Sequence, residues 1–165
     1  MNDEKGQTSA EFIFLTGILI LVVMLSVGFI AGQNELNMAM SAARSGVDGG
    51  VAESSAAIYS ADAYNDYEYS KSSLLYPYSV DIVNISYNDL GMDNNYAKKK
   101  IQFKVYAKAS KQFTKSEQDS IGDRINFNLR KSLAICFNST SSTNKLYNPV
   151  FSPHYVFTTA NIKWV

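Results

Sequence analysis

The feature that most constrains this chain is an uninterrupted apolar run near its N-terminus. Residues 12–32 carry no charge, and only Thr16, Ser26 and glycines interrupt the hydrophobic side chains. About 20 helical residues cross the hydrocarbon core of a bilayer, so the run is long enough to span one. A cleavable secretory signal has a shorter apolar core, of about 7–15 residues. The run therefore predicts a membrane-spanning helix.

The basic residues on either side of this run indicate its orientation. Lys5 is the only basic residue before the run, and Arg44 is the first one after it. Because Lys5 lies closer to the bilayer, the N-terminus is expected in the cytoplasm. The chain from about residue 33 onward is then expected outside the cell.

One carboxylate, Glu11, stands at the edge of the apolar run. Thr8 and Glu11 match a capping box, in which Thr8 is the N-cap and Glu11 reaches back to its backbone N–H. A carboxylate in the first turn also suits the helix dipole. These general effects explain Glu11 without giving it a function.

A more specific pattern surrounds Glu11. The segment "KGQTSAEF", followed by an apolar helix, resembles the N-terminus of archaeal type IV pilin-like proteins. It is similar to the methanogen group that carries a class III signal peptide with the signature Gln-x-Ser-x-Glu-Phe. The four fixed positions of that signature are filled by Gln7, Ser9, Glu11 and Phe12. The resemblance implies that a membrane-embedded prepilin peptidase cuts between Gly6 and Gln7 and removes residues 1–6 as a leader.

The same resemblance implies that the helix is retained after cleavage and packs into a filament core with other pilin subunits. Cleavage before Gln7 creates a new α-amine, which would be withdrawn from water together with Glu11. An isolated buried ion is costly, whereas a pair offsets much of that cost. Glu11 is therefore expected to set the register of assembly, within or between subunits.

The resemblance also implies where the protein works. The chain would be a single-pass membrane protein before assembly, and then a major or minor subunit of an extracellular filament on the cell surface. Attachment to surfaces or glycans is the expected role, with adhesion as its outcome.

Small residues in the apolar run allow close helix packing. Gly28 and Gly32 form a G-x-x-x-G motif, a spacing that lets membrane helices approach one another. Glycine is also frequent in membrane helices in general, so the motif is compatible with bundling and no more.

Beyond residue 32 the helical pattern continues but becomes amphipathic, with apolar residues spaced by three and four. We expect one long helix over residues 7–60. Gly46, Gly49 and Gly50 are expected to bend or weaken it, because an interior glycine costs about 1 kcal/mol relative to alanine.

Residues 61–165 are expected to form a small extracellular head domain, which gives an α+β fold with an antiparallel sheet and a second helix. Residues 61–79 are rich in Tyr, Asp, Asn and Ser and contain Pro77, which predicts a loop. Residues 78–88 and 100–109 predict a β-hairpin, and residues 154–165 predict a strand that joins it. The second strand of the hairpin alternates cleanly, and its inward positions are Ile101, Phe103, Val105 and Ala107.

Residues 114–137 predict the second helix. Thr114 and Glu117 form a candidate capping box at its start. Apolar residues then repeat every four positions and predict a stripe that packs in the core. The stripe consists of Ile121, Ile125, Leu129 and Leu133. Residues 138–153 are expected to form a loop.

The composition offers little support for catalysis, metal binding or nucleic-acid binding. The 15 acidic and 15 basic residues balance, which gives no electrostatic reason for a nucleic-acid partner. Cys136 is the only cysteine and His154 the only histidine, so neither a disulfide within the chain nor a metal site is expected. Cys136 is interpreted as a small buried apolar residue. No nucleophile–base motif or phosphate-binding loop occurs, and neither enzymatic activity nor a cofactor is expected.

Two sequons are candidate sites of N-glycosylation. Asn84 begins Asn-Ile-Ser on a predicted strand, and Asn138 begins Asn-Ser-Thr in a predicted loop. Asn84 is accessible only if it points to solvent while Val83, Ile85 and Tyr87 pack inward. The loop position of Asn138 favours access.

Two other functions remain open at this point. The chain could be a monomeric, membrane-anchored extracellular binding module, or an anchored enzyme whose site carries no recognisable motif. An ordinary anchor has no use for a cleavage motif at Gly6 and Gln7 or for a carboxylate at Glu11, and this favours the pilin hypothesis.

Overall fold

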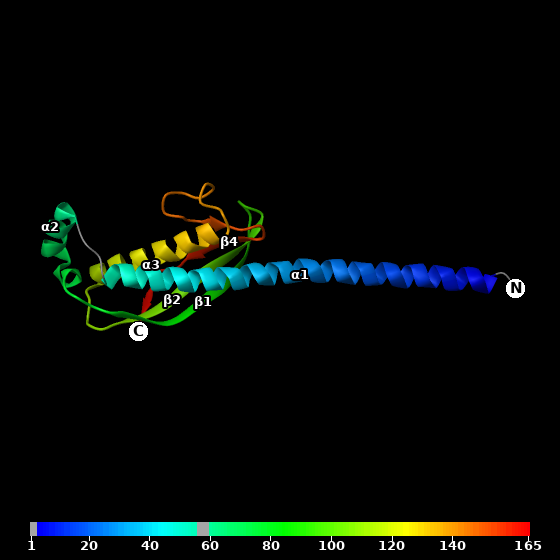
Figure 1. Ribbon diagram of the computed structural model, residues 1–165, viewed down its shortest axis with the longest axis horizontal. Helices are drawn as coiled ribbons and strands as arrows, with labels where there is room; N and C mark the ends of the chain where they lie inside the picture. Colours follow the sequence, from blue (N-terminus) through cyan, green and yellow to red (C-terminus); the bar gives the residue numbers. More distant parts are fainter. Residues whose placement is uncertain (1–2, 56–59) are drawn as a thin grey trace. The chain divides into compact units, whose positions relative to one another are not determined.

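The computed structural model describes residues 3–55 and 60–165, with the side chains from residue 9 onward in the first range. Its helices are α1 (Asp3–Ser55), α2 (Ala61–Ser70), a short 3-10 helix η1 (Ser72–Leu75) and α3 (Lys115–Cys136). Its strands are β1 (Val80–Asp93), β2 (Lys98–Ala109), β3 (Val150–Phe151), β4 (Tyr155–Thr159) and β5 (Lys163–Trp164), as Figure 1 shows. The chain forms two units, residues 1–37 and residues 38–165, which are described separately. The predicted α+β layout, with a long apolar N-terminal helix, is confirmed.

Helix α1 begins earlier than the expected range of 7–60, and residues 56–59 of that range lie outside the described residues. It begins at Asp3, so Thr8 lies inside the helix and is not its N-cap, and the capping-box interpretation of Thr8 is wrong. The described part of α1 extends to Ser55, and near this point the hydroxyl of Tyr78 donates a 2.8 Å hydrogen bond to the Ser54 carbonyl.

The glycines at 46–50 do not interrupt α1, contrary to expectation. Gly46 and Gly50 lie against α3, and Figure 1 shows the two helices side by side in the unit of residues 38–165. A Cβ on Gly46 would lie 2.6 Å from the Asn128 carbonyl oxygen and 2.7 Å from the Cα of Leu129. A Cβ on Gly50 would lie 2.8 Å from the Cα of Ile125. Gly46 and Gly50 therefore permit close approach of the two helix backbones, and the packing against α3 offsets their propensity cost.

The sheet is mixed, where an antiparallel sheet was expected. β1 and β2 form the predicted antiparallel hairpin, but β4 and β5 both run parallel to β2. β3 then pairs antiparallel with β4, which gives the order β1-β2-β4-β3. The parallel direction follows from α3, which connects β2 to the C-terminal strands. Because a helical crossover returns the chain to the end of the sheet at which β2 begins, the strand that follows can run in the same direction as β2.

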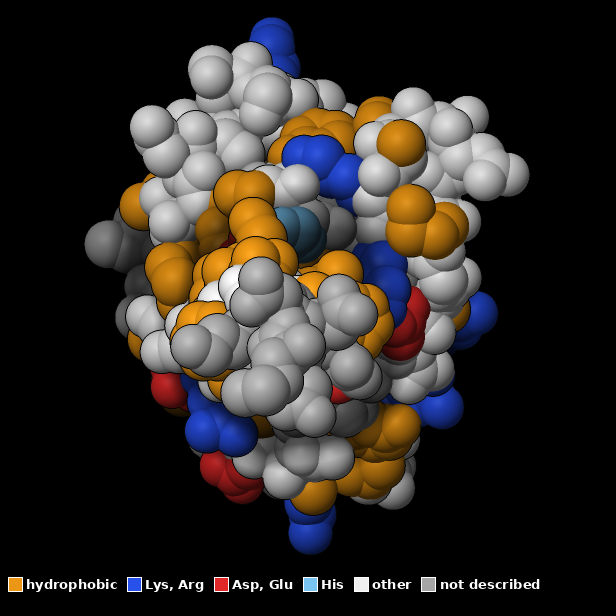
Figure 2. All heavy atoms as spheres, turned by 90° about the vertical axis from the view of Figure 1, so that its right-hand side faces the viewer, with side chains coloured by type: hydrophobic (Ala, Val, Ile, Leu, Met, Phe, Trp, Pro, Cys, Tyr) orange, Lys and Arg blue, Asp and Glu red, His pale blue; other side chains and the backbone are white. Residues whose placement is uncertain are grey.

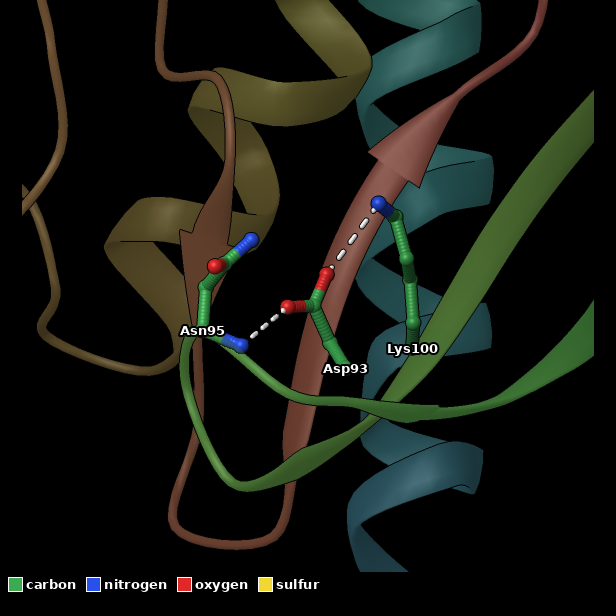
Figure 3. Close-up of polar contacts among 3 residues, drawn as sticks. All are labelled: Asp93, Asn95 and Lys100. Carbon is green, nitrogen blue, oxygen red and sulfur yellow. Dashed lines mark hydrogen bonds and ion pairs between the residues drawn. The ribbon is translucent and has the colours of Figure 1, made fainter.

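The hairpin extends further than predicted, to Asp93 on β1 and Lys98 on β2. The side chain of Asp93 holds the turn of the hairpin, as Figure 3 shows. Its Oδ1 accepts a 2.9 Å hydrogen bond from the backbone N–H of Asn95, and its Oδ2 accepts a 3.2 Å hydrogen bond from Nζ of Lys100. These hydrogen bonds hold the pKa of Asp93 below its ordinary value, and the bond from Asn95 has a larger effect than the bond from Lys100. Asp93 therefore closes the turn as a carboxylate.

The core lies between β2, β4 and the inner face of α3. The alternation predicted for β2 is confirmed, since Ile101, Phe103, Val105 and Ala107 are all buried. The predicted stripe of α3 is buried throughout: Ile121, Ile125, Leu129 and Leu133. α1 contributes Ala39, Ala43 and Val47. The short side chains on α1 match the close approach of the two helices.

Residues 61–79, expected to form a loop, contain α2 and η1. Ser60 acts as the N-cap of α2 by accepting the backbone N–H of Ala63 at 3.5 Å, and Asp62 lies in the first turn. The guanidinium of Arg124 on α3 donates a 2.9 Å hydrogen bond to the hydroxyl of Tyr67. These polar contacts fix α2, which contains no buried residue and for that reason carries no apolar pattern that predicts a helix.

Candidate assembly segment and head-domain sites

The apolar half of α1 exposes its side chains to the surroundings. Phe12 is 70% exposed, Leu25 68% and Phe29 70%, although such residues are the ones that folding normally buries. Figure 2 shows this face of the molecule, with many hydrophobic side chains in orange at the surface. Within the described residues, one helix is long and apolar enough to cross a membrane, and none of its most apolar stretch is buried within the chain. This is weakly consistent with a single membrane anchor.

The two hydroxyl side chains of the apolar run are compatible with hydrocarbon. Thr16 donates a 2.8 Å hydrogen bond to the Phe12 carbonyl, and Ser26 donates one of the same length to the Val22 carbonyl. Each hydroxyl thus bonds to the backbone one turn earlier. Since a bilayer core offers no water to unpaired polar groups, satisfaction within the helix is what a membrane-spanning segment needs.

The predicted processing residues all lie in the first turns of α1. Gly6 and Gln7 have helical backbone, and the side chain of Gln7 lies outside the described residues. Ser9, Glu11 and Phe12 are exposed. Ser9 and Phe12 are three positions apart and therefore near neighbours on the helix surface.

The predicted packing motif at Gly28 and Gly32 has a counterpart elsewhere on the helix. A Cβ on Gly28 would meet nothing within 4 Å, and Gly32 is half-buried. The G-x-x-x-G spacing that brings helices together in this structure is instead that of Gly46 and Gly50. The sequence signal for this contact was present, because the spacing is identical to that of the first pair.

Both sequons lie on the surface of the head. Asn84 is exposed, and a register shift between Ile82 and Asn84 places a bulge at Val83. Val83 is consequently 59% exposed, contrary to the expectation that it packs inward. Asn138 is exposed just after α3, with a positive φ of 49° that asparagine tolerates better than most residues.

Cys136 is exposed rather than buried, so its interpretation as a small core residue is wrong. Cys136 is the last residue of α3. The residue before it, Ile135, is 62% exposed, whereas Ala134 is buried. Partial desolvation nevertheless raises the pKa of the thiol above its ordinary value. A raised pKa keeps the thiol protonated at neutral pH, and this disfavours it as a nucleophile.

Glu117 is the most enclosed carboxylate of the head, at 3% exposure. Its Oε2 accepts the backbone N–H of Thr114 at 2.9 Å and the Thr114 hydroxyl at 3.0 Å, and its Oε1 accepts the backbone N–H of Ser73 at 3.2 Å. Burial by itself would raise the pKa of Glu117, but the hydrogen bonds outweigh burial and the pKa is lowered. The predicted capping box is confirmed, and it also attaches η1 to the start of α3.

Comparisons with known proteins add no assignment. No protein-family model, no curated protein and no solved structure matches this chain. The function is therefore inferred from the exposed apolar helix, the residues at its start and the surface of the head.

Proposed function

We propose that this chain is a pilin-like subunit of an archaeal type IV pilus-like filament. A prepilin peptidase cuts it between Gly6 and Gln7 on the cytoplasmic side of the membrane. Its apolar helix then leaves the bilayer and packs among the helices of other subunits, while the head faces outward and serves surface attachment. The observation that carries the proposal is an exposed apolar helix whose hydroxyls are satisfied within it and whose first turns contain Gln7, Ser9, Glu11 and Phe12.

The physical support for this proposal is that the exposed apolar side chains of this helix are unfavourable in water. Its exposed side chains extend over residues 12–30, and apolar area of this kind is stabilised by lipid or by another protein surface. Lipid satisfies this need before assembly, and the helices of neighbouring subunits satisfy it afterwards. The Glu11 carboxylate at the edge of the run pairs with the new α-amine, because two buried opposite charges are less costly together than apart.

The exposed sequons support a glycosylated filament surface. We propose Asn84 and Asn138 as acceptors, since both side chains are exposed in the head. In a filament whose core is made of the apolar helices, glycans at these positions lie on the outside and do not interfere with helix packing.

Immunogold labelling of the producing cells tests the proposal. An antibody is raised against the exposed loop at residues 140–148 and applied to wild-type cells and to cells that lack the chain. The proposal predicts gold particles on extracellular filaments of the wild type and none on the deletion strain. Gold confined to the cell envelope would contradict a filament and support a membrane-anchored binding module instead.

A further inference from the structure

The head, which is the unit of residues 38–165, exposes apolar side chains at the end where the chain enters it. These side chains play no part in the proposed filament core. Met38, the first residue of the unit, lines a groove together with Ile135 and Cys136 at the end of α3. Met38 is 49% exposed and Ile135 62% exposed. The start of the unit and the last turn of α3 therefore lie at the same end, which we call the base of the head.

The turn of the β1–β2 hairpin also belongs to the base. Phe137, which follows α3, stacks on Phe157, with 5.4 Å between the ring centroids. Phe157 pairs with Ile101 near the start of β2, so the end of α3 lies close to the hairpin turn. Three further large apolar side chains are exposed at this turn: Leu90, Met92 and Tyr96. The base therefore presents apolar side chains from α1, α3 and the hairpin.

The continuity of the chain places the base beside the bilayer when residues 12–32 span it. The five residues between the apolar run and Met38 continue the helix and rise about 7.5 Å. The headgroup layer has a similar depth, about 5–7 Å on each side of the hydrocarbon core. The base therefore begins where the headgroups end. Membrane helices tilt by about 20° on average, and such a tilt brings one side of the base into the headgroups.

The polar residues beside the hairpin turn suit a lipid surface. Three lysines, at positions 98–100, stand against the two carboxylates Asp89 and Asp93, which leaves one net positive charge. Lysine stems lie along apolar surface while the ammonium group stays at the level of the headgroups. Tyrosine is enriched at the same level, because its ring is apolar and its hydroxyl is polar. Apolar, tyrosine and lysine side chains together are typical of a surface that lies in the headgroup layer.

We propose that, in the unassembled chain, the base of the head docks on the lipid headgroups on its own side of the membrane. Leu90 and Met92 enter the headgroup layer, and Tyr96 lies at its level. The apolar area is small, so docking depends on α1, which tethers the base to the membrane at a high effective concentration. Docking fixes the orientation of the head, and assembly must release it. This inference rests on the membrane-spanning helix of the proposed function and does not require a filament.

A fluorescent label at the hairpin turn tests docking. The full chain carries Asn94→Cys and Cys136→Ser, both at exposed positions, so that one cysteine remains for the environment-sensitive fluorophore NBD. The labelled chain is placed in vesicles of phosphatidylcholine and phosphatidylglycerol, with and without a nitroxide quencher on the headgroups. Docking predicts blue-shifted emission and quenching by the nitroxide. The same label at Asp81→Cys, at the other end of β1, is expected to show neither.

Apolar variants separate docking from simple closeness to the membrane. Leu90→Ser combined with Met92→Ser removes apolar area from the base, and because both side chains are exposed the core stays intact. The combination is expected to shift the equilibrium between docked and free heads about tenfold toward the free state, and quenching falls with it. Val83→Ser is the matched control, since Val83 is exposed on the same strand but away from the turn. It is expected to leave quenching unchanged.

Three results would overturn docking on lipid. The label at position 94 could be neither shifted nor quenched, or the combined Leu90 and Met92 variant could be quenched as strongly as its parent. The blue shift could also grow with the density of the chain in the vesicles, which would show that a second copy covers the base. These results leave the membrane span and the filament standing. Flotation of the vesicles reports the span separately, and a chain that does not float with them would contradict both the span and docking.

Discussion

At the scale of single residues, two carboxylates of this chain have very different surroundings. Glu117 is buried in the head and accepts hydrogen bonds from Thr114 and Ser73. Glu11 is exposed in the isolated chain, at the edge of an apolar run. The first carboxylate stabilises the fold of the head, whereas the second is proposed to act only when the helix assembles.

Glu117→Gln is expected to lower the free energy of unfolding of the head by about 1–3 kcal/mol at neutral pH, because the amide nitrogen cannot accept the hydrogen bonds that the carboxylate accepts. The folded-state pKa of Glu117 is lowered, so its contribution is fully present above the unfolded pKa of about 4.3 and is lost as pH falls through the folded pKa. Urea unfolding of both chains at a series of pH values, followed by circular dichroism, measures this.

The matched control for Glu117 is Glu68→Gln, since Glu68 is exposed on α2. That variant is expected to unfold like the wild type at every pH. If the stability difference between wild type and Glu117→Gln stayed constant from neutral to acidic pH, the hydrogen-bonded carboxylate would not be its cause.

Glu11→Gln is expected to leave leader removal intact but to abolish filaments. Glutamine keeps the size of the side chain and its capacity for hydrogen bonds, but it removes the charge that we propose to pair with the α-amine of Gln7. Mass spectrometry of the membrane fraction reports cleavage, and electron microscopy reports filaments. Asp48→Asn, an exposed carboxylate on the same helix, is the control. Filaments at wild-type yield from the Glu11 variant would refute the pairing.

At the scale of elements, the helix α1 combines two kinds of glycine. Gly46 lies against the backbone of α3, whereas Gly49, on the same helix, has nothing within 4 Å of its Cβ position. Helix propensity is equally unfavourable for both glycines, and they differ only in whether α3 packs against them.

The same substitution at both positions is therefore expected to have opposite effects. Gly46→Ala places a Cβ 2.6 Å from the Asn128 carbonyl oxygen and is expected to destabilise the head by about 1–3 kcal/mol, because α1 and α3 must move apart. Gly49→Ala is expected to stabilise it by up to about 1 kcal/mol. Urea unfolding measures both. A loss of stability in the Gly49 variant, or none in the Gly46 variant, would contradict this packing.

The elements that could be predicted are those whose burial leaves a period in the sequence. The repeat from Ile121 to Leu133 and the alternation from Ile101 to Ala107 each reflect one face turned to the core, and both were correct. α2 was missed because it is fixed by polar contacts from Ser60 and Tyr67, which leave no such period.

Strand direction and a pocket of the head could not be predicted from the sequence, for a different reason. The parallel pairing of β4 with β2 depends on where α3 returns the chain, and local propensity does not encode it. A polar pocket lies between α3 and a segment near the C-terminus, and its lining residues Asn126 and Asn161 are far apart in sequence. Either asparagine alone resembles any surface residue.

At the scale of the whole molecule, the chain consists of an apolar segment that is stabilised by lipid or by another protein surface, and a head with its own core. The unit of residues 38–165 contains the sheet, α3 and the buried part of α1. The exposed apolar side chains of residues 12–30 lie in the other unit. The membrane affinity of the chain should therefore reside in the first unit alone.

Removal of residues 1–32 is expected to move the protein from the detergent phase to the aqueous phase in a Triton X-114 partition. The deleted residues contain the large apolar side chains that are exposed along the described part of α1, with the exception of Met38, and the rest of the chain keeps its core. Deletion of residues 1–6 alone is the control and should leave the protein in the detergent phase. A detergent-phase truncated head would show that other surfaces also bind membranes.

The most direct test of the account is the N-terminal residue of the protein on the producing cell. Surface filaments are sheared from the cells, and the intact chain in that fraction and in the membrane fraction is analysed by mass spectrometry. The account predicts a chain that begins at Gln7, or at its cyclised form, in the filament fraction. A chain that begins at Met1 and occurs only in membranes would contradict processing and assembly together, and would leave a membrane-anchored binding module.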